Sequence, residues 1–159
     1  MVISGFPGIG KSWLFANADA LNIKATDSDS SAFSWVKTSE GTTIRNPEFP
    51  DNYIEHIKEV EKENDIVMVS SHKEVRDALL KNNIKFVLVY PHISLKNEYI
   101  KRYTNRGNKE GFIYLLENNW EKWISEIEKE KGYKKIVLTE PTDYLYDVIK
   151  TKNLIEKIK

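Results

Sequence analysis

The segment from Gly5 to Ser12 reads GFPGIGKS and contains the pattern G-x-x-x-x-G-K-S. Such a pattern surrounds an anion with backbone N–H groups, and the glycines at positions 5, 8 and 10 allow the close approach that this needs. The pattern works between a strand and a helix, because the helix then directs its positive end at the same anion. Residues 2–4 are predicted to form that strand, and residues 11 to about 18 the helix. The sequence therefore predicts a phosphate-binding loop in an α/β domain.

This loop is expected to hold the phosphates of ATP together with Mg²⁺. The Lys11 ammonium would bridge the β- and γ-phosphates, and the Ser12 hydroxyl would bind Mg²⁺. The residues expected to contact the nucleotide are Gly5, Gly8, Ile9, Gly10, Lys11, Ser12 and Trp13. A chance glycine-rich turn is the weaker interpretation, because the pattern is complete and lies between a predicted strand and a predicted helix.

Short apolar runs alternate with segments of helical period along the rest of the chain. Strands are predicted at 2–4, 22–26, 66–71, 85–91 and 135–139, and helices at 11–18, from 51 onward, at 73–83, 94–107, 111–131 and 143–158. Asp51 is the expected cap of its helix, and residues 30–50 read as irregular chain. This alternation predicts one α/β domain over residues 1–159, with a parallel sheet covered by helices on both faces. Ligands of such sheets bind beyond the carboxyl ends of the strands.

Composition excludes several classes of protein. The chain has no cysteine, so it has neither disulfides nor thiolate metal sites. Its formal net charge is zero, which gives no overall basic field and makes nucleic acid an unexpected partner. No apolar run approaches the roughly 18 residues of a membrane span, and residues 1–3 lead straight into the loop without room for a signal peptide. A soluble cytoplasmic protein is expected.

An acidic segment follows the second predicted strand. The apolar strand IVMVSS ends without the aspartate that often accompanies such loops, and TDSDSS (26–31) is the expected substitute. Asp27 and Asp29 are expected to point to opposite faces, with Asp27 near the Mg²⁺ and Asp29 near the acceptor of the phosphoryl group. The alternative is a loop of ordinary turn-forming residues.

The four arginines stand out in a chain rich in lysine. Arg102 and Arg106 share a helix face, and on a closing lid (about residues 94–112) they would stabilise charge on the transferred group. The alternative is a solvated helix face on which Glu98 pairs with Arg102. Arg45 and Arg76 are candidates for binding an anionic acceptor, although either is also consistent with a surface arginine.

Further acceptor contacts are expected from His72 and from the segment 30–50, which would cover the acceptor pocket. His72 is equally consistent with a structural histidine. Four aromatic residues in and around this segment would form either a flat wall against a ring of the acceptor or the core of a small insertion. They are Phe33, Trp35, Phe49 and Tyr53. Trp120 and Trp123 are expected to pack their helix.

Together, GFPGIGKS, the acidic strand end, VMVSSHKEVRDAL and EYIKRYTNRG resemble the small P-loop kinases. This group includes the nucleoside monophosphate kinases and the gluconate and shikimate kinases, and the chain is also similar to small nucleotide kinases encoded by bacteriophages of low-GC bacteria. The resemblance covers residues 1 to about 140. It implies a three-layer fold with a five-stranded parallel sheet of order 2-3-1-4-5, Mg·ATP as phosphoryl donor, and a lid that carries arginines.

The resemblance leaves the acceptor open. A nucleoside monophosphate kinase needs no general base, because its acceptor is already a phosphate anion. The pair Asp27 and Asp29 looks like the D-x-D of shikimate kinases, which implies a hydroxyl of a small metabolite or polynucleotide end as the acceptor and Asp29 as the base. A nucleotide monophosphate acceptor is the first hypothesis, a hydroxyl acceptor the second, and a non-enzymatic nucleotide-binding module the third.

Overall fold

The computed structural model describes residues 1–151 and contains a five-stranded parallel sheet. Its strands are β1 (Val2–Gly5), β2 (Ala25–Ser28), β5 (Ile66–Ser70), β6 (Phe86–Pro91) and β7 (Lys134–Leu138), in the order β2-β5-β1-β6-β7. Every neighbouring pair of these strands is parallel. The predicted α/β class with a parallel sheet is therefore confirmed.

Two short strands that the sequence does not predict form a separate hairpin. β3 (Trp35–Lys37) and β4 (Thr43–Arg45) pair with each other in the stretch 30–50 that reads as irregular. Because β3 and β4 take two numbers in the chain, the order of the main sheet, β2-β5-β1-β6-β7, differs from the predicted numbering. Counted among the strands of the main sheet alone, it is 2-3-1-4-5.

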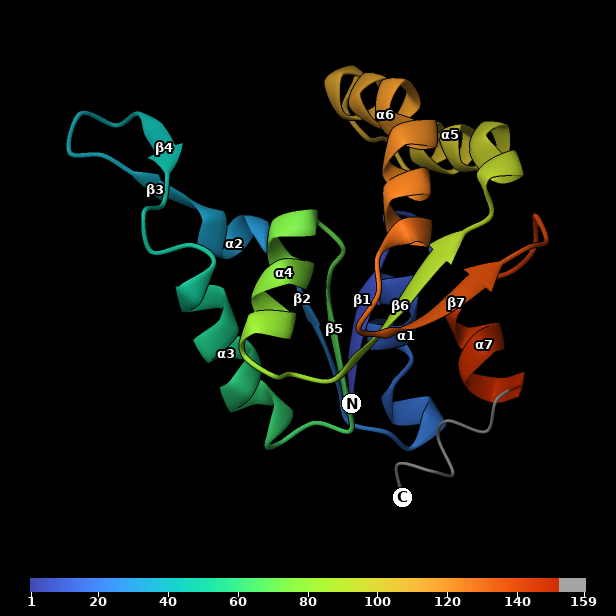
Figure 1. Ribbon diagram of the computed structural model, residues 1–159, viewed down its shortest axis with the longest axis horizontal. Helices are drawn as coiled ribbons and strands as arrows, with labels where there is room; N and C mark the ends of the chain where they lie inside the picture. Colours follow the sequence, from blue (N-terminus) through green and yellow to red (C-terminus); the bar gives the residue numbers. More distant parts are fainter. Residues whose placement is uncertain (152–159) are drawn as a thin grey trace.

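The helices lie on both sides of the sheet and beyond its upper edge (Figure 1). They are α1 (Lys11–Ala16), α2 (Ser31–Ser34), α3 (Asp51–Glu61), α4 (Lys73–Lys81), α5 (Lys96–Asn105), α6 (Glu110–Lys129) and α7 (Leu145–Thr151), with short 3₁₀ turns at Asp19–Leu21 and Ile93–Leu95. α5 and α6 stand beyond the carboxyl ends of the strands, where ligands of such sheets bind. Over residues 1–151, no helix is both long enough and apolar enough to traverse a membrane.

The central strands are mostly apolar, as expected where helices cover both of their faces. Residues Ile66–Val69 of β5 are fully buried, and α3 packs Tyr53, Ile54 and Ile57 beneath the sheet edge. Trp120 of α6 is buried and its indole Nε1 donates to the carbonyl of Ile93 at 2.7 Å. The packing role predicted for Trp120 is confirmed.

Several predicted helix boundaries differ from the structure. Pro50 occupies the cap position of α3, Asp51 is its first residue, and no side chain caps this helix, so the predicted Asp51 cap is wrong. The helix predicted at 94–107 begins as a 3₁₀ turn before α5. The last helix ends at Thr151, and the remainder of the predicted 143–158 segment lies outside the described residues.

Candidate active site

The predicted loop lies where three strands meet. Gly5 ends β1 and is paired with Ser70 of β5 on one side and Val89 of β6 on the other. Gly8 and Gly10 have backbone φ angles of +86° and +98°, which residues other than glycine rarely adopt. Gly10 stands directly before α1, so the loop has the strand–loop–helix geometry that an anion-binding loop requires.

Lys11 folds back over this loop. Its Nζ donates to the carbonyls of Gly5 at 2.8 Å and Phe6 at 3.3 Å. Burial lowers the pKa of Lys11 to about 8, against the opposing charges of Asp27 and Asp29 that raise it. The ammonium is therefore held by neutral carbonyl oxygens, which a negatively charged ligand would displace.

This lowered pKa predicts that ATP binding weakens at high pH. Phosphate binding requires the ammonium, and the free protein loses that proton as the pH rises through about 8, so binding at higher pH must be accompanied by proton uptake. We expect the Kd for Mg·ATP to rise about tenfold between about pH 7 and about pH 9. Calorimetric titrations in buffers of different ionisation enthalpy measure both the Kd and the protons taken up. A Kd that does not change over this range would contradict the assignment, and Lys11→Ala should show no such dependence.

Ser12 and Asp27 form the candidate magnesium site. The Ser12 hydroxyl donates to Asp27 Oδ2 at 2.9 Å, across from α1 to β2. Among residues 1–151, no group of three His, Cys, Asp or Glu side chains is arranged to hold a metal ion. A hydroxyl and one carboxylate nonetheless fit Mg²⁺, which keeps several waters and takes its other oxygen ligands from bound phosphates.

Asp27 and Asp29 lie on the same side of β2, so the prediction of opposite faces is wrong. Residues two apart on a strand share a face, and both carboxylates line the cavity beside the loop. Ser28 between them points the other way, where its hydroxyl is 2.9 Å from His56 Nε2. The Asp29 carboxylate accepts from the Ser31 N–H at 2.9 Å, which fixes its direction.

Arg102 of α5 contacts the phosphate-binding loop predicted at residues 5–12. Its guanidinium donates to the carbonyls of Gly8 at 3.0 Å and Asp143 at 3.2 Å, and it lies 4.0 Å from the ring centre of Tyr144. Glu98 is 3.7 Å away, so the alternative pairing also occurs. Helix α5 is further tied to the loop by the Tyr103 hydroxyl, which donates to the Pro7 carbonyl at 2.8 Å.

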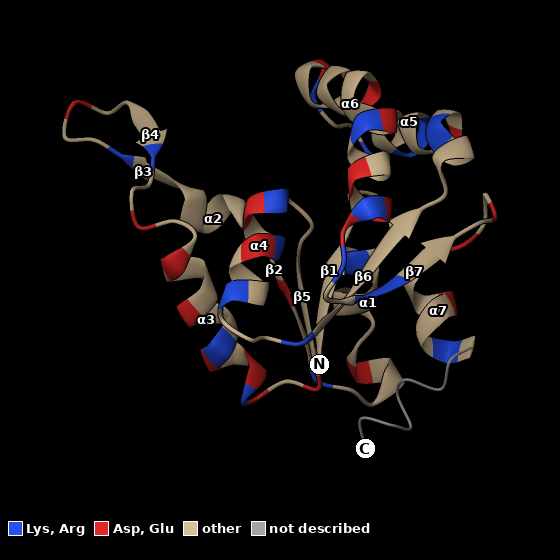
Figure 2. Cartoon of the chain, viewed as in Figure 1, with Lys and Arg blue, Asp and Glu red and all other residues tan. Residues whose placement is uncertain are grey.

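Arg106 follows the end of α5 and lines the same cavity. Its Nε donates to Asn108 Oδ1 at 2.7 Å, and its charge contributes to the lowered pKa of Lys11. Figure 2 shows basic residues on α5 and acidic residues on β2. Of the two predicted arginines, Arg102 thus contacts the loop directly, and Arg106 lines the cavity beside it.

Arg76 is a structural residue rather than an acceptor ligand. It is 3% exposed, and its Nε and Nη2 donate to the two carboxylate oxygens of Glu130 at 2.8 and 2.7 Å. Its Nη1 donates to the Ser71 carbonyl. The guanidinium touches the cavity, but these partners hold its donors, and the prediction that it binds the acceptor is not supported.

The hairpin residues Arg45 and Trp35 do not line the cavity. Arg45 pairs with Glu74 of α4 and lies 4.7 Å from the ring centre of Phe49. Phe33 and Phe49 both pack on Tyr53, which makes these three residues the core of the insertion instead of a wall against a ligand. The segment 30–50 therefore does not cover the cavity through these side chains.

The cavity has a volume of about 1210 Å³ and extends from the loop to α6. His72, the residue directly before α4, lines it. The prediction missed a group of lining residues, which includes Ser70, Ser71, Lys73, Lys101, Tyr144 and several residues of α6. Helical spacing places the α6 residues on shared faces, but nothing in the sequence shows that one face is open to a cavity.

No protein-family model matches the chain, and no curated protein sequence matches it.

Proposed function

We propose that the protein is an Mg²⁺- and ATP-dependent phosphotransferase of the small P-loop kinase type. One observation carries the proposal: Lys11, the Ser12–Asp27 pair and Arg106 converge on an anion-binding loop within a single cavity. Phosphoryl transfer needs positioning and positive charge more than covalent chemistry, and this arrangement supplies both.

Each residue has a definite task in this proposal. Lys11 leaves the carbonyls of its own loop and contacts the β- and γ-phosphates of ATP. Ser12 and Asp27 would hold Mg²⁺, which would supply positive charge against the phosphates. Arg106 uses only its Nε in the hydrogen bonds of the described residues, which leaves its terminal nitrogens for the transferred group. Arg102 holds the lid against the loop and against Tyr144.

The first candidate acceptor is a ribo- or deoxyribonucleoside monophosphate. The cavity combines a cationic floor at the loop with an apolar wall on α6, and its size suits a donor and an acceptor together. An acceptor with an anionic end and a planar ring matches these two surfaces. Because Arg76 is paired with Glu130 and Lys73 with Asp77, the acceptor phosphate is left to Arg106 and Lys101, which line the same cavity.

The second candidate is a kinase that phosphorylates a hydroxyl. The observation that favours it is Asp29, whose carboxylate lines the cavity and forms no ion pair among the described residues. In this reaction Asp29 would accept the hydroxyl proton as the acceptor oxygen attacks the γ-phosphorus, while the bond from that phosphorus to the β–γ bridging oxygen breaks and ADP leaves.

Asp29→Asn separates the two candidates. With a monophosphate acceptor, we expect kcat to change little and the acceptor KM to rise by less than about tenfold, because no proton has to be removed. With a hydroxyl acceptor, kcat should fall by about 10²–10⁴-fold. Steady-state kinetics with each acceptor that stimulates ADP release measure both constants. Asp51→Asn, on the exposed first turn of α3, is the matched control.

A further inference from the structure

One face of α6 forms an apolar wall of the cavity. The apolar residues that α6 contributes to the lining are Phe112, Leu115, Leu116, Trp123 and Ile127. They recur at helical spacing, so they form a stripe along the helix. Trp120 and Ile124 are fully buried and pack the helix onto the rest of the protein. Leu116 and Ile127 of this stripe are also buried, at 2% and 1% exposed, so Phe112, Leu115 and Trp123 are the members that remain accessible to whatever enters the cavity.

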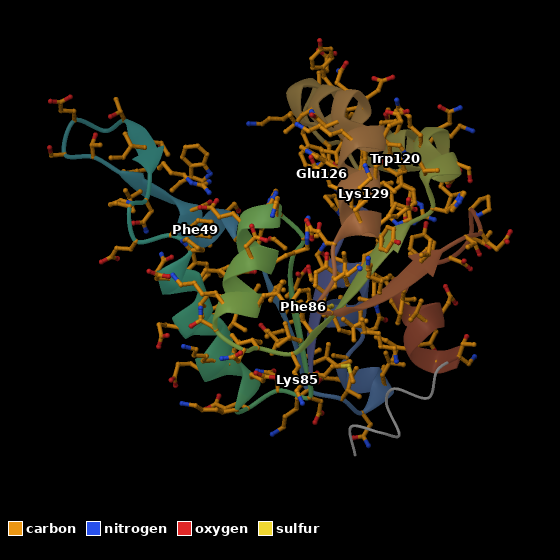
Figure 3. All side chains as sticks on the ribbon, in the orientation of Figure 1. Phe49, Lys85, Phe86, Trp120, Glu126 and Lys129 are labelled. Atoms are coloured by element: carbon orange, nitrogen blue, oxygen red, sulfur yellow. The ribbon has the colours of Figure 1, made fainter. Side chains whose placement is uncertain are left out.

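Glu126 is the acidic residue that α6 contributes to this wall. Its side chain is half-buried, and within residues 1–151 it takes part in no ion pair. Figure 3 shows Glu126 and Trp120 on different sides of α6. The next turn carries Glu130, whose carboxylate is satisfied by Arg76 and by the Tyr133 hydroxyl. Glu126 thus presents a carboxylate to the cavity from an apolar surface.

The Arg76–Glu130 ion pair fixes the position of the C-terminal end of α6, and with it the position of the apolar wall. It joins the end of α6 to α4 and, through the Ser71 carbonyl, to the end of β5. Tyr144 follows β7, and β5 and β7 lie on opposite sides of β1 in the sheet. The wall near Glu126 is therefore on the β5 side of the loop, away from the Tyr144 side where Arg102 is stacked.

We infer that the α6 wall binds the ring of the acceptor and that Glu126 accepts hydrogen bonds from N–H groups on its edge. This inference rests on the proposed function, and it specifies the acceptor as a nucleotide with an amino-bearing base. A carboxylate only accepts hydrogen bonds, and leaving it without a donor in a half-buried wall is unfavourable. Guanine offers two adjacent N–H donors to the two oxygens, and adenine and cytosine offer an amino group. Uracil and thymine offer one N–H between two carbonyl oxygens, which the carboxylate repels.

The test is a binding titration with the donor site filled. The protein is saturated with Mg²⁺ and a non-hydrolysable ATP analogue and titrated by calorimetry with GMP, AMP, CMP, UMP and dTMP. We expect GMP to bind tightest, and UMP and dTMP to bind at least about tenfold more weakly than GMP. Glu126→Gln adds an amide donor, so it should weaken GMP binding and strengthen UMP binding, and the difference between them should fall to less than about threefold.

Glu117→Gln is the matched control, because Glu117 is exposed on the same helix and does not line the cavity. It should leave all five affinities unchanged. Equal binding of all five nucleotides by the unchanged protein, no binding of any, or an unaltered preference in Glu126→Gln would each overturn the inference. Because this titration needs no turnover, a protein that binds GMP selectively but transfers no phosphate would support the inference and contradict the proposed function.

Discussion

Replacing Lys11 by alanine is expected to reduce phosphoryl transfer by at least about 10²–10³-fold in kcat. The ammonium is the cation placed directly on the loop, and its partners in the structure are carbonyl oxygens that a phosphate would replace. Burial has already lowered its pKa to about 8, so the charge is poorly solvated and gains most from an anion. Rates of ADP formation at saturating ATP and acceptor provide the measurement.

The same substitution should leave the fold intact. A folded-state pKa below the ordinary value means that burying the charged form opposes folding at neutral pH, so alanine removes an unfavourable contribution. We expect the Tm of Lys11→Ala to equal or exceed that of the unchanged protein. Lys58→Ala, on the surface of α3, is the control for a general effect of losing a lysine. Turnover by Lys11→Ala within a few-fold of the unchanged protein would refute the assignment of the loop.

Arg76→Ala is expected to destabilise the protein by about 3–5 kcal/mol. The substitution leaves Glu130 without its bidentate partner and removes the donor to the Ser71 carbonyl. Partial burial pushes the pKa of Glu130 up, but the hydrogen bonds from Arg76 and Tyr133 outweigh this and hold the pKa below its ordinary value. This depressed pKa means that the pair stabilises the protein above the unfolded-state pKa and loses that effect as the pH falls through the lower folded-state value.

Urea unfolding at neutral and acidic pH measures this contribution. The double variant Arg76→Met and Glu130→Leu should recover most of the lost stability, because it leaves no unpaired buried charge. If Arg76 were instead an acceptor ligand, Arg76→Ala would raise the acceptor KM with no loss of stability, and that result would contradict the structural role.

The parts of the site that sequence predicts well are the local ones. The loop from Gly5 to Ser12 is specified by consecutive residues, and the structure places it between β1 and α1 as expected. Arg102 and Arg106 both line the cavity, because one helix carries Arg102 and leads directly to Arg106. Burial of the central strands follows directly from their unbroken apolar composition.

The errors concern partners that are distant in the sequence. Arg76 looks like a ligand until Glu130, 54 residues away, is placed beside it. Arg45 and Trp35 lie opposite each other in a hairpin, which forms only by pairing across a turn. Phe33 and Phe49 pack in the core of the insertion. The wall on α6 has the same limitation, since helical spacing gives faces and only the tertiary structure shows which face borders the cavity.

The most direct test of phosphotransferase activity uses ATP labelled at its γ-phosphate. The protein, Mg²⁺ and the labelled ATP are incubated with each nucleoside monophosphate, and in parallel with shikimate, gluconate and a 5′-hydroxyl oligonucleotide, and the products are separated. We expect label in a nucleoside diphosphate, in amounts that Lys11→Ala abolishes. Label in a hydroxyl compound alone would favour the second candidate, a kinase that phosphorylates a hydroxyl with Asp29 as the base. ATP binding without transfer to any acceptor would contradict the phosphotransferase proposal and favour a nucleotide-binding module.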